Sequence, residues 1–89
     1  MPGWVRKGDN NNAGAPVVGS LADTVIINGK NAALRGSIVA THSSHVVPTI
    51  QVGSATVQVE GRPPAFLGAA DSCGHSQKEA SDDVIIPGA

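Results

Sequence analysis

The chain has almost no aromatic residues: among its 89 residues only Trp4 and Phe66 are aromatic, and tyrosine is absent. Large aromatic side chains supply much of an ordinary hydrophobic core, and a chain of this length buries only roughly 60% of the surface that its unfolded form exposes. Domains this small are commonly stabilised by disulfides, a metal ion or a partner. The single cysteine, Cys73, cannot form an intrachain disulfide. A metal ion or a partner therefore remains as the source of additional stability.

Other classes of protein are disfavoured by what is missing. The formal net charge of −1 shows no excess of the basic residues that bind nucleic acid, so we expect no nucleic-acid partner. The N-terminal residues lack the apolar run of a signal peptide, and no segment approaches the ~20 apolar residues of a membrane helix. We therefore expect a single domain over residues 1–89 that is made in the cytoplasm without a signal peptide.

Short runs of β-branched residues are what the chain does contain. They lie at 23–29, 36–41, 45–53, 55–61 and 82–88, and Gly, Pro, Asn and Asp bound them. Such runs are typical of short strands joined by tight turns. With 11 Gly and 6 Pro spread along the chain, no window suits a helix, and the polar residues 76–83 are predicted to form a loop. The sequence predicts an all-β protein of many short strands.

The strand runs repeat along the chain. Residues 27–30 (Ile-Asn-Gly-Lys) match residues 59–62 (Val-Glu-Gly-Arg), Gly36 matches Gly68 in the same register, and the run at 82–88 resembles a third, truncated copy. Repeats of this kind indicate units that cannot bury their apolar faces alone. We therefore expect three small β-units arranged with pseudo-threefold symmetry. The same register sets Thr41-His42 opposite Cys73-Gly74, so the loops that follow equivalent strands should meet at one end of the molecule.

All the histidines and the cysteine fall into two pairs, His42-x-x-His45 and Cys73-x-His75. Imidazole and thiolate are preferred zinc ligands, and four protein ligands form a closed, structural site. We predict that these residues hold one structural zinc ion per chain, with iron as the alternative that the ligand types leave open. A catalytic metal needs an open position, and the nearby Asp71 is interpreted as a turn former rather than a base. The alternative has unrelated loop histidines and a cysteine that packs as a small hydrophobe.

These features resemble the PAAR-repeat proteins over almost the full length of the chain. The family pattern of Gly-Asp, Gly-Ser, Asn-Gly and Cys-Gly occurs here in order, at residues 8–9, 19–20, 28–29 and 73–74, with a further Gly-Ser at 53–54. The second Gly-Asp of the family has become Gly-Ser at 36–37 and Gly-Ala at 68–69. The Pro-Ala-Ala-Arg signature has drifted to Asn-Ala-Ala-Leu at 31–34 and Pro-Pro-Ala-Phe at 63–66. The arginine and aspartate that would pair in the family are absent from both of these copies.

The resemblance implies a small cone of short strands with zinc near its apex, and it carries the ligand roles to His42, His45, Cys73 and His75. It also implies a non-enzymatic tip protein that caps the trimeric β-helical spike of a contractile injection machine, in a type VI secretion system or a phage tail. One tip per trimer would then aid penetration of the target envelope and contact the target membrane transiently. Effectors carried noncovalently are a further class of partner, and no fused effector extension is expected in a chain of this length.

Residues that would contact the spike can be named from the strand runs. The apolar ends of these runs should lie toward the broad base, with Trp4 as an interface anchor, and ordinary core packing is the alternative for each. The set is Trp4, Val25, Ile27, Val57, Val59, Val84 and Ile86. Two other functions stay open. A small zinc-dependent hydrolase or effector would need only three protein ligands and an exchangeable water, and a zinc-stabilised binding module would be unrelated to spikes.

Overall fold

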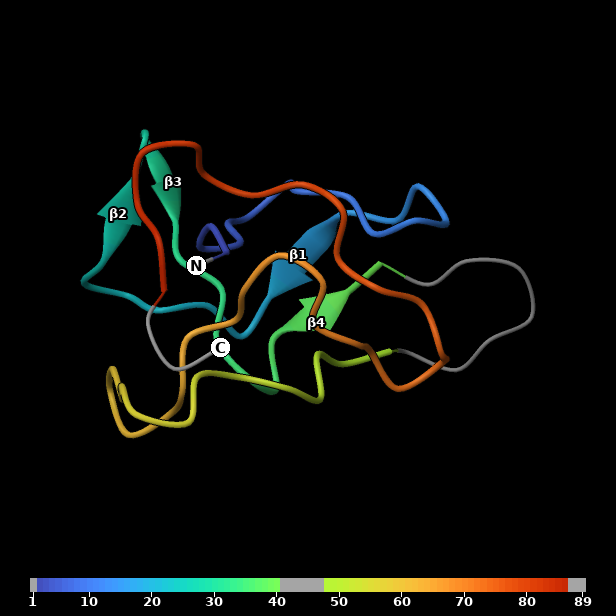
Figure 1. Ribbon diagram of the computed structural model, residues 1–89. Helices are drawn as coiled ribbons and strands as arrows, with labels where there is room; N and C mark the ends of the chain where they lie inside the picture. Colours follow the sequence, from blue (N-terminus) through green and yellow to red (C-terminus); the bar gives the residue numbers. More distant parts are fainter. Residues whose placement is uncertain (1, 41–47, 87–89) are drawn as a thin grey trace.

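The structure, a computed structural model, describes residues 2–40 and 48–86. Its named strands are short and antiparallel. Strand β1 (Val17–Gly19) pairs with β4 (Ile38–Val39), and β2 (Ile26–Ile27) pairs with β3 (Lys30–Asn31), as Figure 1 shows. The other pairings in the described residues are isolated β-bridges. These residues contain no helix, residues 76–83 included, which confirms the all-β prediction and the loop.

Two tight turns of the same kind join successive strand segments. Between β2 and β3, Asn28 and Gly29 have φ values of 52° and 81°, which is the left-handed backbone that favours Asn-Gly in two-residue hairpin turns. Glu60 and Gly61 repeat this geometry with φ values of 53° and 81°. The backbones of residues 59 and 62 exchange hydrogen bonds across that turn. The structure therefore has matching turns where the sequence register aligned residues 27–30 with 59–62.

Three segments meet in a closed ring of backbone hydrogen bonds. The Val5 N–H donates to Ala65 O (3.0 Å), the Ala65 N–H donates to Ala33 O (3.0 Å), and the Ala33 N–H donates to Val5 O (2.8 Å). Each segment turns three residues later at a glycine with positive φ, namely Gly8, Gly36 and Gly68. Segments 4–9, 32–37 and 64–69 therefore hold like places around the ring.

The two ends of the chain pair with each other beside Trp4. The Trp4 N–H donates to Val84 O (2.9 Å), and the Ile86 N–H donates to Pro2 O (2.8 Å). The run at 82–86 thus pairs with the N-terminal residues, as 25–27 does with 30–32 in the β2–β3 hairpin. This pairing explains why the sequence shows only a truncated third copy at the C-terminus: its other half lies at the N-terminus.

The molecule is elongated, with extents of 33 × 24 × 24 Å. Figure 1 shows the β2–β3 hairpin and the 59–62 turn at one end, and the turns at 11–15 and 71–75 at the opposite end. A second ring of backbone bonds ties the latter end together, each bond measuring 2.8 Å. Its donors and acceptors are Asn12 N–H to Ser76 O, Ala40 N–H to Pro16 O and Ser72 N–H to Thr49 O.

Two hydrophobic clusters lie along this length. The first surrounds the ring and consists mainly of alanine and valine: Val5, Ala15, Val17, Ala33, Val39, Ile50, Ala65 and Ala69. The second lies toward the β2–β3 end and contains the larger side chains: Trp4, Ala22, Ile27, Ala32, Leu34 and Ile86. Small residues allow the three segments of the ring to approach closely. No helix among the described residues is long and apolar enough to cross a membrane.

Candidate metal centre

The turn that carries Cys73 and His75 is organised by the carboxylate of Asp71. Asp71 Oδ1 accepts hydrogen bonds from the backbone N–H of Cys73 (3.1 Å), the backbone N–H of His75 (3.0 Å) and the Cys73 Sγ–H (3.2 Å). Gly74 closes the turn with a φ of 88°. Asp71 is therefore the turn former that the sequence indicated.

Asp71 is also a buried charge, because only 4% of the residue is exposed. Burial acts to raise its pKa, but hydrogen bonds from Asn11, Cys73 and His75 outweigh burial and lower the pKa of this carboxyl. Asn11 Nδ2 donates to Asp71 Oδ2 at 2.9 Å. The carboxylate therefore stays ionised and fixes the backbone of the turn from within.

The surroundings that lower the pKa of Asp71 have the opposite effect on the pKa of Cys73. Desolvation, and then the hydrogen bond to Asp71, raise the pKa of the Cys73 thiol. A thiol with a raised pKa keeps its proton at neutral pH. A metal ion that bound here would have to displace that proton, since the thiolate is the ligand, and its affinity would rise with pH.

A second turn with the same hydrogen bonds stands beside the first but carries no metal ligand. Asn11 Oδ1 accepts from the backbone N–H of Ala13 (2.9 Å) and Ala15 (3.0 Å), and Gly14 has a φ of 81°. Sequence reasoning missed Asn11. The shared spacing of Asn11-x-x-Gly14 and Asp71-x-x-Gly74 is the signal that could have found it.

Two of the four predicted ligands, His42 and His45, lie outside the described residues. The chain on either side of them is held next to the Asp71 turn. The Val39 N–H donates to Pro48 O (2.9 Å), and the Thr49 N–H donates to Ser72 Oγ (3.0 Å). Within residues 2–40 and 48–86, no three His, Cys, Asp or Glu side chains form a group that could hold a metal. The four-ligand site stays a prediction.

The predicted spike-contact residues lie in or beside the second hydrophobic cluster. Ile27 and Ile86 are buried in it, and Val25, Val59 and Val84 pack against it; Val57 is half-buried. Trp4 is 9% exposed, and its Nε1–H donates to Ala33 O at 2.8 Å. Their contact with a partner stays a prediction. The exposed apolar side chains at this end are instead Ile26 and Ile85, at 56% and 52%.

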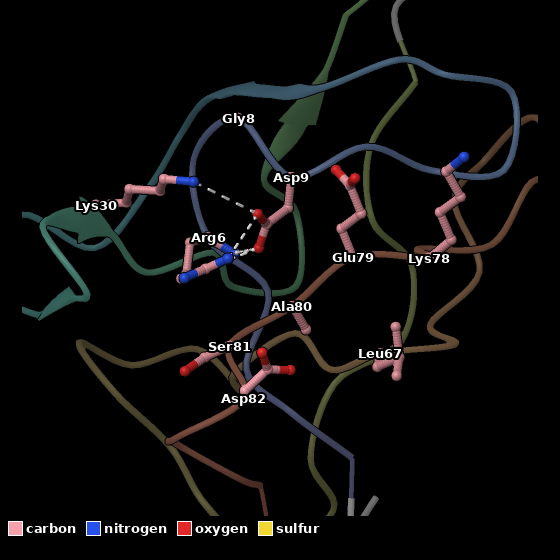
Figure 2. A pocket seen from close by; sticks show the side chains of 10 residues that line it. All are labelled: Arg6, Gly8, Asp9, Lys30, Leu67, Lys78, Glu79, Ala80, Ser81 and Asp82. Atoms are coloured by element: carbon pink, nitrogen blue, oxygen red, sulfur yellow. Dashed lines mark hydrogen bonds and ion pairs between the residues drawn. The ribbon is translucent and has the colours of Figure 1, made fainter.

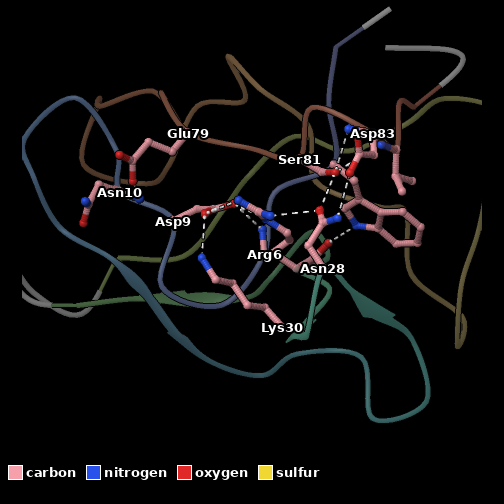
Figure 3. Close-up of polar contacts among 11 residues, drawn as sticks. Arg6, Asp9, Asn10, Asn28, Lys30, Glu79, Ser81 and Asp83 are labelled. Carbon is pink, nitrogen blue, oxygen red and sulfur yellow. Dashed lines mark hydrogen bonds and ion pairs between the residues drawn. The ribbon is translucent and has the colours of Figure 1, made fainter.

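An arginine–aspartate pair is present at a place that sequence reasoning did not compare. Arg6 Nε and Nη2 donate to the two oxygens of Asp9, each at 3.0 Å, as Figure 3 shows. In the ring, Arg6 and Asp9 hold the places of Leu34 and Ser37 in the next segment. The backbone bonds agree, because Arg6 N–H to Asp9 Oδ2 and Leu34 N–H to Ser37 Oγ both measure 2.8 Å.

The polar network continues from this pair toward the β2–β3 turn. Arg6 Nη1 donates to Asn28 Oδ1 (3.0 Å), which also accepts from Ser81 Oγ (2.7 Å) (Figure 3). Asn28 Nδ2 in turn donates to Asp83 (3.0 Å). Residues from both ends of the chain and from its middle are thereby joined.

Three β-segments form a ring, turns gather at each end, and the described residues contain no helix, so the class is a small all-β protein. The sequence profile of the PAAR motif matches residues 7–76, and the chain belongs to the PAAR motif family. A search of curated proteins found no match. Family membership makes this chain a spike-tip protein of contractile injection systems, with a spike as its partner.

Proposed function

We propose that the protein caps a trimeric β-helical spike, one tip per trimer, and forms the point that enters the target envelope. The observation that carries this proposal is the closed ring made by Val5, Ala33 and Ala65. Because three unlike segments hold like places, the ring supports a pseudo-threefold axis within one chain. Such an axis can be laid along the true threefold axis of a trimer.

The β2–β3 end is the face that we expect to meet the spike. A β-helical trimer ends in unpaired strand edges and apolar side chains, which invite aggregation unless they are covered. The tip presents Ile26 and Ile85 at this end, both more than half exposed. Gln58 stands at the corresponding place in the third segment, between the half-buried Val57 and Val59. The base would therefore be apolar on two of its three sides.

The opposite end would be stiffened by zinc held by His42, His45, Cys73 and His75. The donor set suits a closed structural site, and the described half of it, Cys73 and His75, is fixed on one turn by Asp71. The bound ion would supply a crosslink between two loops and contribute directly to folding free energy. This end is built largely of turns, so it has little hydrophobic core that could stabilise it instead.

The capping proposal is tested by mixing the purified chain with a trimeric spike protein and measuring the mass of the complex. We expect one tip per trimer, and we expect Ile26→Glu combined with Ile85→Glu to abolish the complex. Val18→Glu is the matched control, because Val18 is 47% exposed but lies in β1, away from this end. Equal loss with the control, or three tips per trimer, would overturn the proposal.

The zinc proposal is tested separately by elemental analysis of the purified chain and of variants at each ligand. We expect one zinc per chain, and we expect Cys73→Ser and His75→Ala each to lose the metal and lower the melting temperature together. A variant that kept its zinc and its fold but lost a hydrolytic activity would favour the enzyme alternative instead. Metal-free protein with an unchanged melting temperature would refute a structural zinc.

A further inference from the structure

A hollow beside the 59–62 turn is lined by two arginines and three uncharged residues. Its volume is about 460 Å³, and its lining residues are Arg35, Gly36, Ile50, Gln51 and Arg62. Two of these are arginines and none is acidic. Hollows of this composition attract anions, since nothing within them compensates the positive charge.

A second hollow, shown in Figure 2, also has cations, but there a carboxylate faces two of them. There Arg6 and Lys30 both face Asp9, with nitrogen to oxygen distances of 3.0 and 4.0 Å. Arg62 holds the place of Lys30 in the repeat register, and the place of Asp9 is taken by Ser37. The Ser37 hydroxyl accepts from the Leu34 N–H and donates to Ser20 O. The carboxylate that faces two cations in the Figure 2 hollow is thus missing from the hollow between Arg35 and Arg62.

The two arginines have donors that are not in use. Arg62 Nη1 and Nη2 bond to Ser20, but its Nε–H is buried with no acceptor. Arg35 is exposed, and its guanidinium makes no hydrogen bond or ion pair within the described residues. The charge of Glu60 interacts with that of Arg62, but the Glu60 carboxylate hydrogen-bonds to Thr24 Oγ1 at 2.6 Å and does not line the hollow. An anion that accepted from Arg62 Nε would supply the acceptor that this buried atom lacks, and it would have to compete with the bonds from Nη1 and Nη2 to Ser20.

We propose that the hollow between Arg35 and Arg62 binds a phosphate-type oxyanion. Guanidinium groups bind phosphate oxygens through paired, charge-assisted hydrogen bonds. A phosphate carries more acceptor oxygens and more negative charge than a carboxylate, so two guanidinium heads favour it. Inorganic phosphate and phospholipid headgroups share this chemistry.

Titration of the intact chain with sodium phosphate at constant ionic strength, followed by NMR, tests the site. We expect saturable shifts of the Gly36 amide and the Arg35 Nε–H. We expect Arg35→Gln to weaken binding about tenfold, which is about 1.4 kcal/mol, because it removes a charge-assisted hydrogen bond. Lys7→Gln is the matched control: Lys7 holds the place of Arg35 in the N-terminal segment and is exposed. Lys7→Gln should bind phosphate with the same affinity as the unsubstituted protein and should show the same phosphate-induced shifts.

Two further arms identify the source of the phosphate and exclude general anion attraction. Sodium acetate at equal ionic strength should not saturate the same signals. Co-sedimentation with phosphatidylglycerol vesicles, but not with phosphatidylcholine vesicles, that is lost in Arg35→Gln would identify a headgroup; its absence would assign the site to free phosphate. Shifts that are linear, equal in acetate, or unaltered by Arg35→Gln would overturn the proposal. The amide spectrum of Arg35→Gln without phosphate shows whether that variant is still folded.

Discussion

The Arg6–Asp9 ion pair stands where the next segment has Leu34 and Ser37, so the chain contains an uncharged version of the same position. In both places a side-chain oxygen accepts the backbone N–H three residues earlier, at 2.8 Å. The ion pair adds two further hydrogen bonds, made by an arginine whose side chain is 14% exposed and an aspartate that is 4% exposed. Charges this well buried are costly unless they are paired.

Removing one partner should therefore cost more than removing both. We expect Asp9→Ser alone to lower the free energy of unfolding by about 2 kcal/mol, because it leaves the Arg6 charge without its bidentate partner. Arg6→Leu together with Asp9→Ser should recover most of that loss, since it reproduces Leu34 and Ser37. Urea unfolding of both single variants and the double variant measures the coupling. A double variant no more stable than Asp9→Ser would contradict this interpretation.

Gln77 is the residue that fits its surroundings least well. It is 1% exposed, and both atoms of its amide lack a hydrogen-bond partner. By the ring register it holds the place of Val17 and Ile50, which are fully buried apolar residues. A buried polar group without a partner costs roughly 1–3 kcal/mol.

Replacing Gln77 by Met, which is unbranched and of similar shape, should raise the free energy of unfolding by about 1 kcal/mol. Chemical denaturation of the variant measures the change. The control is Gln58→Met, because Gln58 is exposed and should give a change within about 0.5 kcal/mol. A destabilised Gln77→Met would show that the amide has an unseen partner, such as a buried water.

Some of these residue roles could be predicted from the sequence and others could not. The spacing from Asp71 to Gly74 is a local signal, so the turn was predictable. The partners of Arg6, by contrast, lie close to it only because the ring brings the N-terminal segment against Asn28 and Ser81. Pairings that depend on closure of the whole chain leave no local pattern.

The turns at 11–15 and 71–75 form a matched pair. Comparing them separates the effect of backbone strain on stability from its effect on metal binding. Both are closed by a glycine with positive φ, Gly14 at 81° and Gly74 at 88°, and at neither would an added Cβ meet another atom. Any cost of alanine there is consequently conformational rather than steric. The turns differ in that two of the predicted metal ligands, Cys73 and His75, belong to the second alone.

Gly14→Ala and Gly74→Ala should each lower the stability of metal-free protein by about 1–2 kcal/mol, the cost of a left-handed backbone for alanine. In addition, Gly74→Ala should weaken zinc binding, because it disturbs the turn that holds two of the proposed ligands. Competition with a chromophoric chelator measures the affinity of both variants. Equal zinc affinities would place the metal away from this turn.

At the level of elements, the runs predicted at 23–29 and 36–41 contain β2 and β4, whereas β1 and β3 lie outside every predicted run. The described parts of the other three runs form only isolated bridges. Asn28 and Gly29 mark their turn by residue type. The strands at 26–27 and 30–31 are only two residues long because the chain leaves each pairing to join a different segment. Strand propensity carries no information on where such an exchange occurs.

On the scale of the whole molecule, the ring couples parts that are distant in sequence. Val5, Ala33 and Ala65 each donate one bond and accept one bond around it, and all three residues are fully buried. No segment can leave without breaking two bonds and exposing the first hydrophobic cluster. The three copies should therefore open together rather than one by one.

Native-state hydrogen exchange tests this coupling. The amides of Val5, Ala33 and Ala65 should exchange with one common free energy, equal to that of global unfolding, because local opening of a closed ring is blocked by its neighbours. The Arg62 amide, which bonds to Val59 O across the exposed Glu60–Gly61 turn, is the internal control and should exchange with a smaller free energy. If the Val5 amide exchanged well before the other two, the N-terminal segment would be a detachable part. The ring could then not act as one rigid, threefold-like body against a spike.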